Sequence, residues 1–370
     1  MSADLLLQNE TPQYYGTGPG FPSSTNVFVP NLESSGRIIV GYSRNAKDFL
    51  LPRYIKYVES EQSVGLFMKL SLQEAARVVN PQDYEWADGQ PRPTHDDGLE
   101  QFNLIEFRTH RYDYGFNVGW MTKNQAEWPI VEQHSQIHAA QCMTARTVRM
   151  LTVATTASNW QTSADPDMAS NHTNTAATLA GGQFDKGTST VPYIKIGLDK
   201  IAVQIAQDTL YKVQPNQLHV IINPNQARLW AESAEVHEFI KGSYWAKEEL
   251  NDGLHPNNQF GLPSKIYGYD LVVEGTVQVT TRKGATLTKQ FAMPDQNVLV
   301  VARPGELEGV YGAPNFSALT LFWYADEMTV ETFDDPKNRL TEGHVVENTA
   351  EVVTSPLAGY LVTSSTSVAS

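Results

Sequence analysis

Three residues of this chain have types and spacing that could bind one metal ion. His134, His138 and Cys142 recur every four residues, and imidazole and thiolate groups are typical zinc ligands. On a helix, successive members of this set would lie about 5–6 Å apart, so the first and third would be too distant to share a small ion without distortion. We therefore expect these side chains to pack along the flank of a helix, and we predict no metal site.

Other candidates for chemistry are also incomplete. The carboxylate pairs Asp96–Asp97 and Asp334–Asp335 lie in turn-rich sequence, where adjacent acidic residues more often form turns or caps. Gly182, Gly187 and Thr188 have the spacing of a phosphate-binding loop, but no lysine follows the second glycine and no strand precedes it. Neither a GxSxG nor an HExxH motif occurs. We predict no catalytic residue, no cofactor and no enzymatic activity.

Composition and charge narrow the class of protein. The chain has 370 residues, of which 41% are hydrophobic, and this suits a globular protein of two or more subdomains. Its formal net charge of −14 disfavours tight binding to phosphate groups. The single cysteine indicates a reducing compartment, and no apolar run approaches the roughly 20 residues of a membrane span. The first residues do not form a secretory signal, so we expect assembly in a cytoplasm without a membrane partner.

The first third of the sequence predicts an extended structure. Residues 1–36 contain no Lys or Arg and are rich in Gly, Pro and Ser, which is typical of an arm without its own core. Strands are predicted at Val64–Leu70 and Phe102–Trp120, and a short helix with a capping box is predicted at Ser71–Asn80. Together they make a long hairpin-like excursion.

The tip of this excursion supplies the predicted contact residues. Tyr84, Trp86 and Arg92 lie in a polar, proline-rich segment that cannot pack internally. Exposed aromatic side chains there suit an interface, so we predict that these three residues contact another subunit. An equally open alternative is that the two aromatic side chains fold back onto their own domain.

A long helix and a compact second half follow. The helix is predicted over Trp128–Asn159, with a weak apolar stripe that suits a rod with several neighbours. A further helix is predicted at Leu198–Leu210, and Leu218–Trp230 passes from a strand to a helix through Asn223–Pro224. These elements predict a small α/β unit with a mixed sheet. The late β runs, up to Thr363, are expected to be antiparallel strands that pair with the stretch ending at Trp120.

This order of elements resembles the major capsid proteins of tailed bacteriophages that have the Hong Kong 97 fold. VIINPNQARLW (Val220–Trp230) and SPLAGYLV (Ser355–Val362) are similar to segments common in that family, and the resemblance covers nearly the whole chain. It implies an α+β fold with an N-terminal arm, an extended hairpin loop, a long spine helix, a peripheral β domain and an α/β axial domain. The implied boundaries are 1–50 for the arm, 51–115 for the extended loop, 107–159 and 313–363 for the peripheral domain with its spine helix at 128–159, 190–310 for the axial domain, and 364–370 for a C-terminal tail.

The resemblance also implies a function. The chain would be a structural protein of the virion, assembled in the host cytoplasm as hexamers and pentamers into an icosahedral shell. That shell would enclose double-stranded DNA without sequence-specific binding, with portal, scaffolding and decoration proteins as further partners. The candidate loop contains only Lys69, near its base, so no covalent cross-link between subunits is expected. Two alternatives stay open: an encapsulin-like protein compartment of the same fold, and a soluble enzyme with an unrecognised site.

Overall fold

The computed structural model describes residues 49–70, 85–86, 88–89, 102–126, 128–253, 260–282, 284–303 and 317–367. These residues belong to two compact units, which are described separately. The ribbon unit contains residues 111–143 and 326–348, and the sheet unit contains residues 50–110, 144–325 and 349–370. This division cuts through the long helix, so the domain boundaries implied by the resemblance stay predictions.

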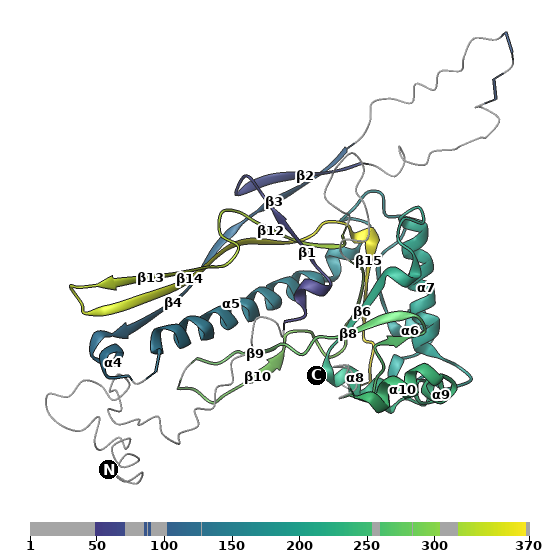
Figure 1. The fold of residues 1–370 in the computed structure, drawn as a ribbon. Coiled ribbons are helices and arrows are strands. Elements are labelled where there is room, and N and C mark those ends of the chain that lie inside the picture. The colour runs from purple at the N-terminus through teal and green to yellow at the C-terminus, as the bar shows by residue number, and fades with distance from the viewer. Residues whose placement is uncertain are drawn as a thin grey trace. The chain divides into compact units, whose positions relative to one another are not determined.

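A six-stranded mixed sheet forms the centre of the sheet unit, as the sequence predicts. Its strand order is β5-β15-β11-β6-β8-β7 (Figure 1). β6 is parallel to β8, whereas β11 is antiparallel to both β6 and β15. The six strands are β5 (Thr173–Thr175), β6 (Leu218–Ile222), β7 (Lys265–Ile266), β8 (Tyr269–Val273), β11 (Val298–Ala302) and β15 (Gly359–Thr363).

The helices of this unit bury their apolar sides in one hydrophobic core with the sheet. In α7, the side chains of Ile194, Leu198, Ile201 and Ile205 recur at helical spacing and are all buried. The helices are α6 (Ala176–Ala180), α7 (Tyr193–Asp208), α8 (Pro224–Glu232), α9 (Ala234–Gly242) and α10 (Tyr244–Asp252).

The predicted step from strand to helix is confirmed. β6 ends at Ile222, Asn223 caps α8 with its side chain, and Pro224 occupies the first turn. The Asn223 side chain accepts a hydrogen bond from the backbone N–H of Gln226, and the Gln226 side chain accepts one from the backbone N–H of Asn223. This reciprocal pair satisfies donors that the helix start would leave unpaired.

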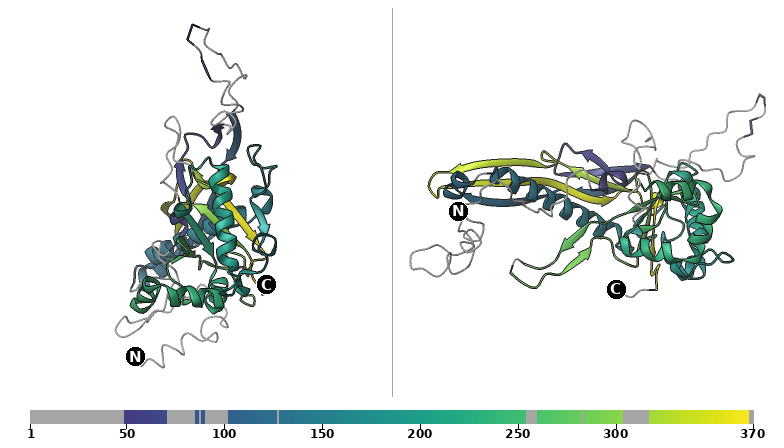
Figure 2. Two further views of the ribbon diagram at one scale, coloured as in Figure 1. Left: turned by 90° about the vertical axis from the view of Figure 1, so that its right-hand side faces the viewer. Right: turned by 60° about the horizontal axis from the view of Figure 1, so that its bottom comes forward.

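Smaller sheets complete the sheet unit. β1 (Lys56–Glu59) runs parallel to β12 (Leu319–Trp323), which pairs with the last part of β14 (Leu340–Val353). Two hairpins are separate two-stranded sheets: β2 (Val64–Leu70) with β3 (Phe102–Arg108), and β9 (Val277–Val279) with β10 (Lys289–Phe291). Figure 2 shows the β9–β10 hairpin projecting from the six-stranded sheet.

The ribbon unit is built on three adjacent strands and helical segments. β14 pairs with β13 (Thr329–Asp335) on one side and with β4 (His110–Gly119) on the other. This pairing confirms the expectation that a late β run meets the stretch ending at Trp120. Helix α4 (Trp120–Gln125) follows β4, and the first part of α5 (Ile130–Ala154) also belongs to this unit.

The long helix is shorter than predicted. It begins at Ile130 and ends at Ala154, and a separate 3₁₀ turn follows at Ala157–Trp160. Side chains end it, because the Asn159 Nδ2 donates to the Val153 carbonyl and the Trp160 Nε1 donates to the Ala154 carbonyl. Carbonyls of the last turn, which lack partners inside a helix, are thereby satisfied without further helix.

Two other expectations need correction. The predicted strand Phe102–Trp120 is divided at Thr109 into β3 and β4, because β3 pairs with β2 whereas β4 pairs with β14. The last strand, β15, joins the six-stranded sheet between β5 and β11 instead of pairing with β4.

The predicted helix Ser71–Asn80 lies outside the described residues. No described helix is long and apolar enough to cross a membrane.

Candidate functional site

The segment predicted to contact another subunit lies in the sequence between strands β2 and β3. The register of the β2–β3 hairpin pairs Val64 with Arg108 and Leu70 with Phe102, so the chain leaves along one strand and returns along the other. Trp86, from the segment between these strands, is 52% exposed, whereas Tyr84 and Arg92 lie outside the described residues. A tryptophan exposed to this extent is typical of a protein–protein interface. The assignment of these three residues as subunit contacts stays a prediction.

The two faces of this hairpin differ in their surroundings. On the inner face, the Phe107 ring stacks on the Phe322 ring with centroids 4.1 Å apart, and the Phe67 ring lies 6.5 Å from the same ring. The outer face exposes three large apolar side chains, those of Val64, Leu66 and Leu104. The register places the exposed Glu106 and Arg108 on the same face, opposite Leu66 and Val64. A buried inner face fixes the hairpin to its unit, and the outer face combines apolar and charged groups as the surface of a protein interface does.

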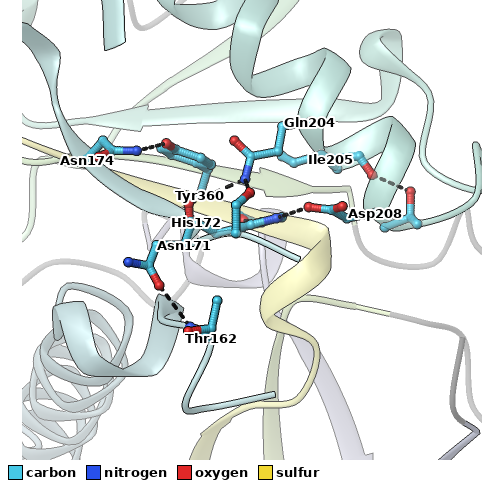
Figure 3. Close-up of polar contacts among 11 residues, drawn as sticks. Thr162, Asn171, His172, Asn174, Gln204, Ile205, Asp208 and Tyr360 are labelled. Carbon is cyan, nitrogen blue, oxygen red and sulfur yellow. Dashed lines mark hydrogen bonds and ion pairs between the residues drawn. The ribbon is translucent and has the colours of Figure 1, made fainter. Parts of the chain in front are cut away.

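A fully buried histidine, His172, links three segments of the sheet unit (Figure 3). Its Nδ1 lies 2.8 Å from the carbonyl oxygen of Gly359 at the start of β15, and its Nε2 lies 2.6 Å from the Oδ2 of Asp208 at the end of α7. The Tyr360 ring packs beside the imidazole at a centroid distance of 5.6 Å. The Tyr360 hydroxyl in turn accepts a hydrogen bond from Asn174 Nδ2.

A histidine beside an aspartate is part of many hydrolytic sites, but this pair differs from a catalytic one. In a triad, one ring nitrogen is oriented by a carboxylate and the other faces a nucleophile. Here the other nitrogen of His172 faces a backbone carbonyl, which can only accept a hydrogen bond. No hydroxyl or thiol group is hydrogen-bonded to this ring in the described part of the chain. The geometry suits a clamp that ties α7 to β15.

A second buried polar cluster surrounds Glu274. Its carboxylate accepts hydrogen bonds from the Tyr54 hydroxyl at 2.9 Å, the Thr276 backbone N–H at 3.0 Å and the Thr276 hydroxyl at 2.6 Å. Burial, followed by the nearby Glu274 carboxylate, raises the pKa of Tyr54 well above its usual value. The phenol therefore stays a hydrogen-bond donor, and this contact ties the segment around Tyr54 to the end of strand β8.

Glu235 forms a third buried cluster, at the start of helix α7. Its two carboxylate oxygens accept the backbone N–H groups of Ile194 at 3.0 Å and Lys195 at 2.9 Å. Burial raises the pKa of Glu235, although hydrogen bonds from these two backbone groups and from Tyr267 oppose the shift. Burial and this carboxylate also raise the pKa of Tyr267. The carboxylate acts as a cap for a helix to which it does not belong.

The residues that resemble a metal site pack as the sequence suggests. The His134 and His138 rings stack beside the Phe116 ring, with centroid distances of 5.5 Å and 5.0 Å, and Cys142 is buried. Burial, and then the charge of His134, lower the pKa of His138. The described ranges contain no group of three side chains that could hold a metal ion.

The acidic pair Asp334–Asp335 has the local role expected of a turn. Hydrogen bonds from Thr341 and Lys123 lower the pKa of Asp334, and those from Asn338 lower the pKa of Asp335. Both carboxylates thus accept hydrogen bonds from residues of the ribbon unit itself. The other pair, Asp96–Asp97, lies outside the described residues.

The glycines with phosphate-loop spacing serve close packing. A Cβ at Gly182 would lie 2.4 Å from the Tyr193 ring, and one at Gly187 would meet the Glu235 carboxylate. A 3₁₀ turn, Phe184–Lys186, lies between these glycines. The need for close approach therefore accounts for both residues.

The sequence reasoning missed the buried clusters around His172, Glu235 and Glu274. His172 lies in a polar stretch without apolar periodicity, and the two glutamates lie in ordinary helical and strand-like sequence. The only available signal was a charged or polar residue next to apolar positions, and this signal does not identify the partner.

Neither a protein-family model nor a curated protein sequence matches the chain. Solved structures do match. The mature capsid of bacteriophage PhiM1 aligns over 95% of this chain and 98% of its own, with a TM-score of 0.54 and 10% sequence identity. The capsid of cyanophage P-SCSP1u aligns over 94% and 98%, with a TM-score of 0.52 and 11% identity.

A third match is a phage-related protein from Bordetella bronchiseptica RB50, which covers 89% of this chain and 95% of its own, with a TM-score of 0.55 and 11% identity. The chain thus has the α+β fold of tailed-phage capsid proteins, the Hong Kong 97 fold, over nearly its whole length. The resemblance found in the sequence is confirmed at the level of the fold.

Proposed function

We propose that this chain is the major structural protein of a phage capsid, located in the virion. The observation that carries the proposal is the extent of the fold match, which covers 95% of this chain and 98% of a mature capsid subunit. The exposed apolar side chains on the outer face of the β2–β3 hairpin support a role in self-association.

The proposed mechanism is geometric, and no chemical step is involved. Copies would associate as hexamers and pentamers in a closed icosahedral shell, in which each copy buries surface on several neighbours and gains stability from them. The shell would be assembled in the host cytoplasm with portal, scaffolding and decoration proteins. The net charge of −14 suits a container that encloses double-stranded DNA without gripping it. We propose no enzymatic activity, and the blocked second nitrogen of His172 supports this view.

Electron microscopy and sedimentation of the purified protein test the proposal. We expect closed shells, or their hexamer and pentamer precursors, in the wild type. Leu66→Asp should reduce assembly at least tenfold without unfolding the subunit, because it replaces an exposed apolar side chain of the outer face with a second negative charge opposite Glu106. Leu66→Met retains an apolar side chain and should assemble normally. The combined change Tyr84→Ala, Trp86→Ala and Arg92→Ala should also impair assembly while the subunit stays folded.

Two results would contradict the proposal. A single small oligomer under every condition would support the alternative of a soluble enzyme. Shells that hold a protein cargo, with no nuclease-protected DNA in particles from the natural source, would support the encapsulin-like compartment.

A further inference from the structure

The β9–β10 hairpin is rooted in the core of the sheet unit and exposed beyond it. At its base, the Ala292 N–H donates to the Thr276 carbonyl, Thr276 is itself bound to the buried Glu274, and the Met293 side chain is fully buried. Beyond the base, strands β9 and β10 pair only with each other among the described strands. Figures 1 and 2 both show the hairpin projecting from the six-stranded sheet. An isolated two-stranded ribbon is marginal in water, so a covering partner would stabilise it.

The hairpin exposes apolar side chains that its own unit does not cover. Val277, Val279 and Leu287 are between 42% and 59% exposed. Val277 and Val279 are two positions apart on one strand and therefore share a face. The register sets Val277 opposite Phe291 and Val279 opposite Lys289, so this face combines apolar groups with a cation.

The charge of the hairpin is opposite to that of the chain as a whole. Residues 277–291 contain Arg282, Lys283 and Lys289 but no Asp or Glu, in a chain with 41 acidic and 27 basic residues. Like-charged copies repel one another over most of their surface, so a positive projection is a natural point of attraction between them.

A matching surface exists on the ribbon unit. We call residues 326–348 the acidic ribbon, because they contain seven acidic and only two basic residues, and all the acidic side chains except the buried Glu347 are at least partly exposed. Strand β13 in this ribbon pairs with β14 alone among the described strands. It exposes about half of the Phe333 side chain, on the face that also carries Glu331, whereas the half-exposed Val330 lies on the opposite face. Exposed apolar groups beside negative charge complement exposed apolar groups beside positive charge.

We propose that the β9–β10 hairpin of one copy docks on the acidic ribbon of a second copy. The identity of the partner rests on the proposed function, since a shell brings copies of this chain together. A nucleic acid is the less suitable partner, because phosphate contacts use the three cations and leave the exposed valines and leucine in water.

The test is a charge reversal with a matched control and a compensating variant. Arg282→Glu/Lys289→Glu should reduce the yield of assembled particles at least tenfold, while circular dichroism and the melting temperature stay those of a folded subunit. Lys212→Glu/Lys247→Glu makes the same change in net charge at two exposed lysines and should assemble normally. Adding Glu327→Lys/Glu331→Lys to the hairpin variant should restore assembly, because the attraction is re-formed with opposite signs.

Each other outcome is decisive. Normal assembly of the hairpin variant overturns this inference and leaves the proposed capsid function intact. Normal assembly combined with loss of retained DNA in a nuclease-protection assay would assign the hairpin to nucleic acid instead. If the wild type forms a small oligomer rather than a shell, the capsid function fails, and the charge reversal must still dissociate that oligomer. A wild type that stays monomeric refutes both.

Discussion

Replacing Glu235 with alanine should destabilise the protein through a helix that lies elsewhere in the sequence. Glu235 is only 2% exposed, and its carboxylate accepts the N–H groups of Ile194 and Lys195 in the first turn of α7. The residue before that helix, Pro192, provides no side-chain cap. Since the first N–H groups of a helix have no partner within it, Glu235→Ala removes the acceptor on which this turn depends.

The magnitude follows from the donors left behind. A buried donor without a partner costs about 1–3 kcal/mol, and the N–H of the buried Ile194 belongs in the upper part of that range. The N–H of Lys195 is only partly buried and can find water, so it belongs at the lower end. We expect Glu235→Ala to lower the free energy of unfolding by about 3–4 kcal/mol. Glu235→Gln keeps the shape and one carbonyl acceptor and should cost about 1–2 kcal/mol.

Urea denaturation followed by circular dichroism measures these differences. Glu238→Ala is the matched control, because Glu238 lies on the same helix, is exposed and makes only a surface ion pair with Lys241. That control should change the free energy of unfolding by less than about 1 kcal/mol. A loss below about 1 kcal/mol for Glu235→Ala, or equal losses for the alanine and glutamine variants, would refute the capping role.

The same carboxylate gives a pH dependence whose sign can be fixed. Burial raises the pKa of Glu235 above its unfolded value, so the folded state binds this proton more tightly than the unfolded state. The contribution of this group to stability is therefore fully present below the ordinary glutamate pKa and is lost as the pH rises through the raised one. The free energy of unfolding of wild type minus that of Glu235→Gln should be larger at acidic than at neutral pH. A difference that grows towards neutral pH would contradict the assignment.

Two further substitutions test the buried contacts of the sheet unit. Tyr54→Phe removes one of the donors to the buried Glu274 carboxylate and should lower the free energy of unfolding by about 1–3 kcal/mol; an unchanged denaturation midpoint would show that the other donors suffice. Gly359→Ala places a Cβ 2.5 Å from the Trp160 ring and should lower the free energy of unfolding by about 1–3 kcal/mol through overpacking. The control Gly242→Ala places a Cβ where no atom lies within 4 Å and should be neutral or stabilising. Equal denaturation midpoints for the two variants would show that Trp160 can shift freely.

The parts of the fold that the sequence predicted well depend on local signals. The bounds of β2, Val64–Leu70, match the prediction, and the step from β6 to α8 is marked by Asn223 and Pro224. Each of these signals acts within a few residues, through alternation of apolar side chains or through capping of a helix start. The order of the elements also predicted the fold, because the resemblance to capsid proteins depends on that order and on few individual residues.

The parts that the sequence could not predict depend on distant partners. Tyr54 and Glu274 are 220 positions apart, and the sequence around each residue does not identify the other as its partner. His172 meets Gly359 across 187 positions, in a stretch whose composition is typical of a linker. The sheet joined by β15 was predicted wrongly for the same reason, since an apolar strand carries no information about which edge it will pair with.

In the two exposed hairpins, the buried groups and the exposed groups have different physical tasks. The inner face of β2–β3 is held by the stacked Phe107 and Phe322 rings, and the base of β9–β10 is held by the buried pair Glu274 and Thr276. Both hairpins then expose apolar side chains that contribute nothing to the core of their own unit. Substitutions of the buried groups should therefore change the free energy of unfolding, whereas substitutions at the exposed faces should change association alone. In the proposed shell, a subunit built this way would fold before it meets its neighbours, because the groups that stabilise it are not those offered to a partner.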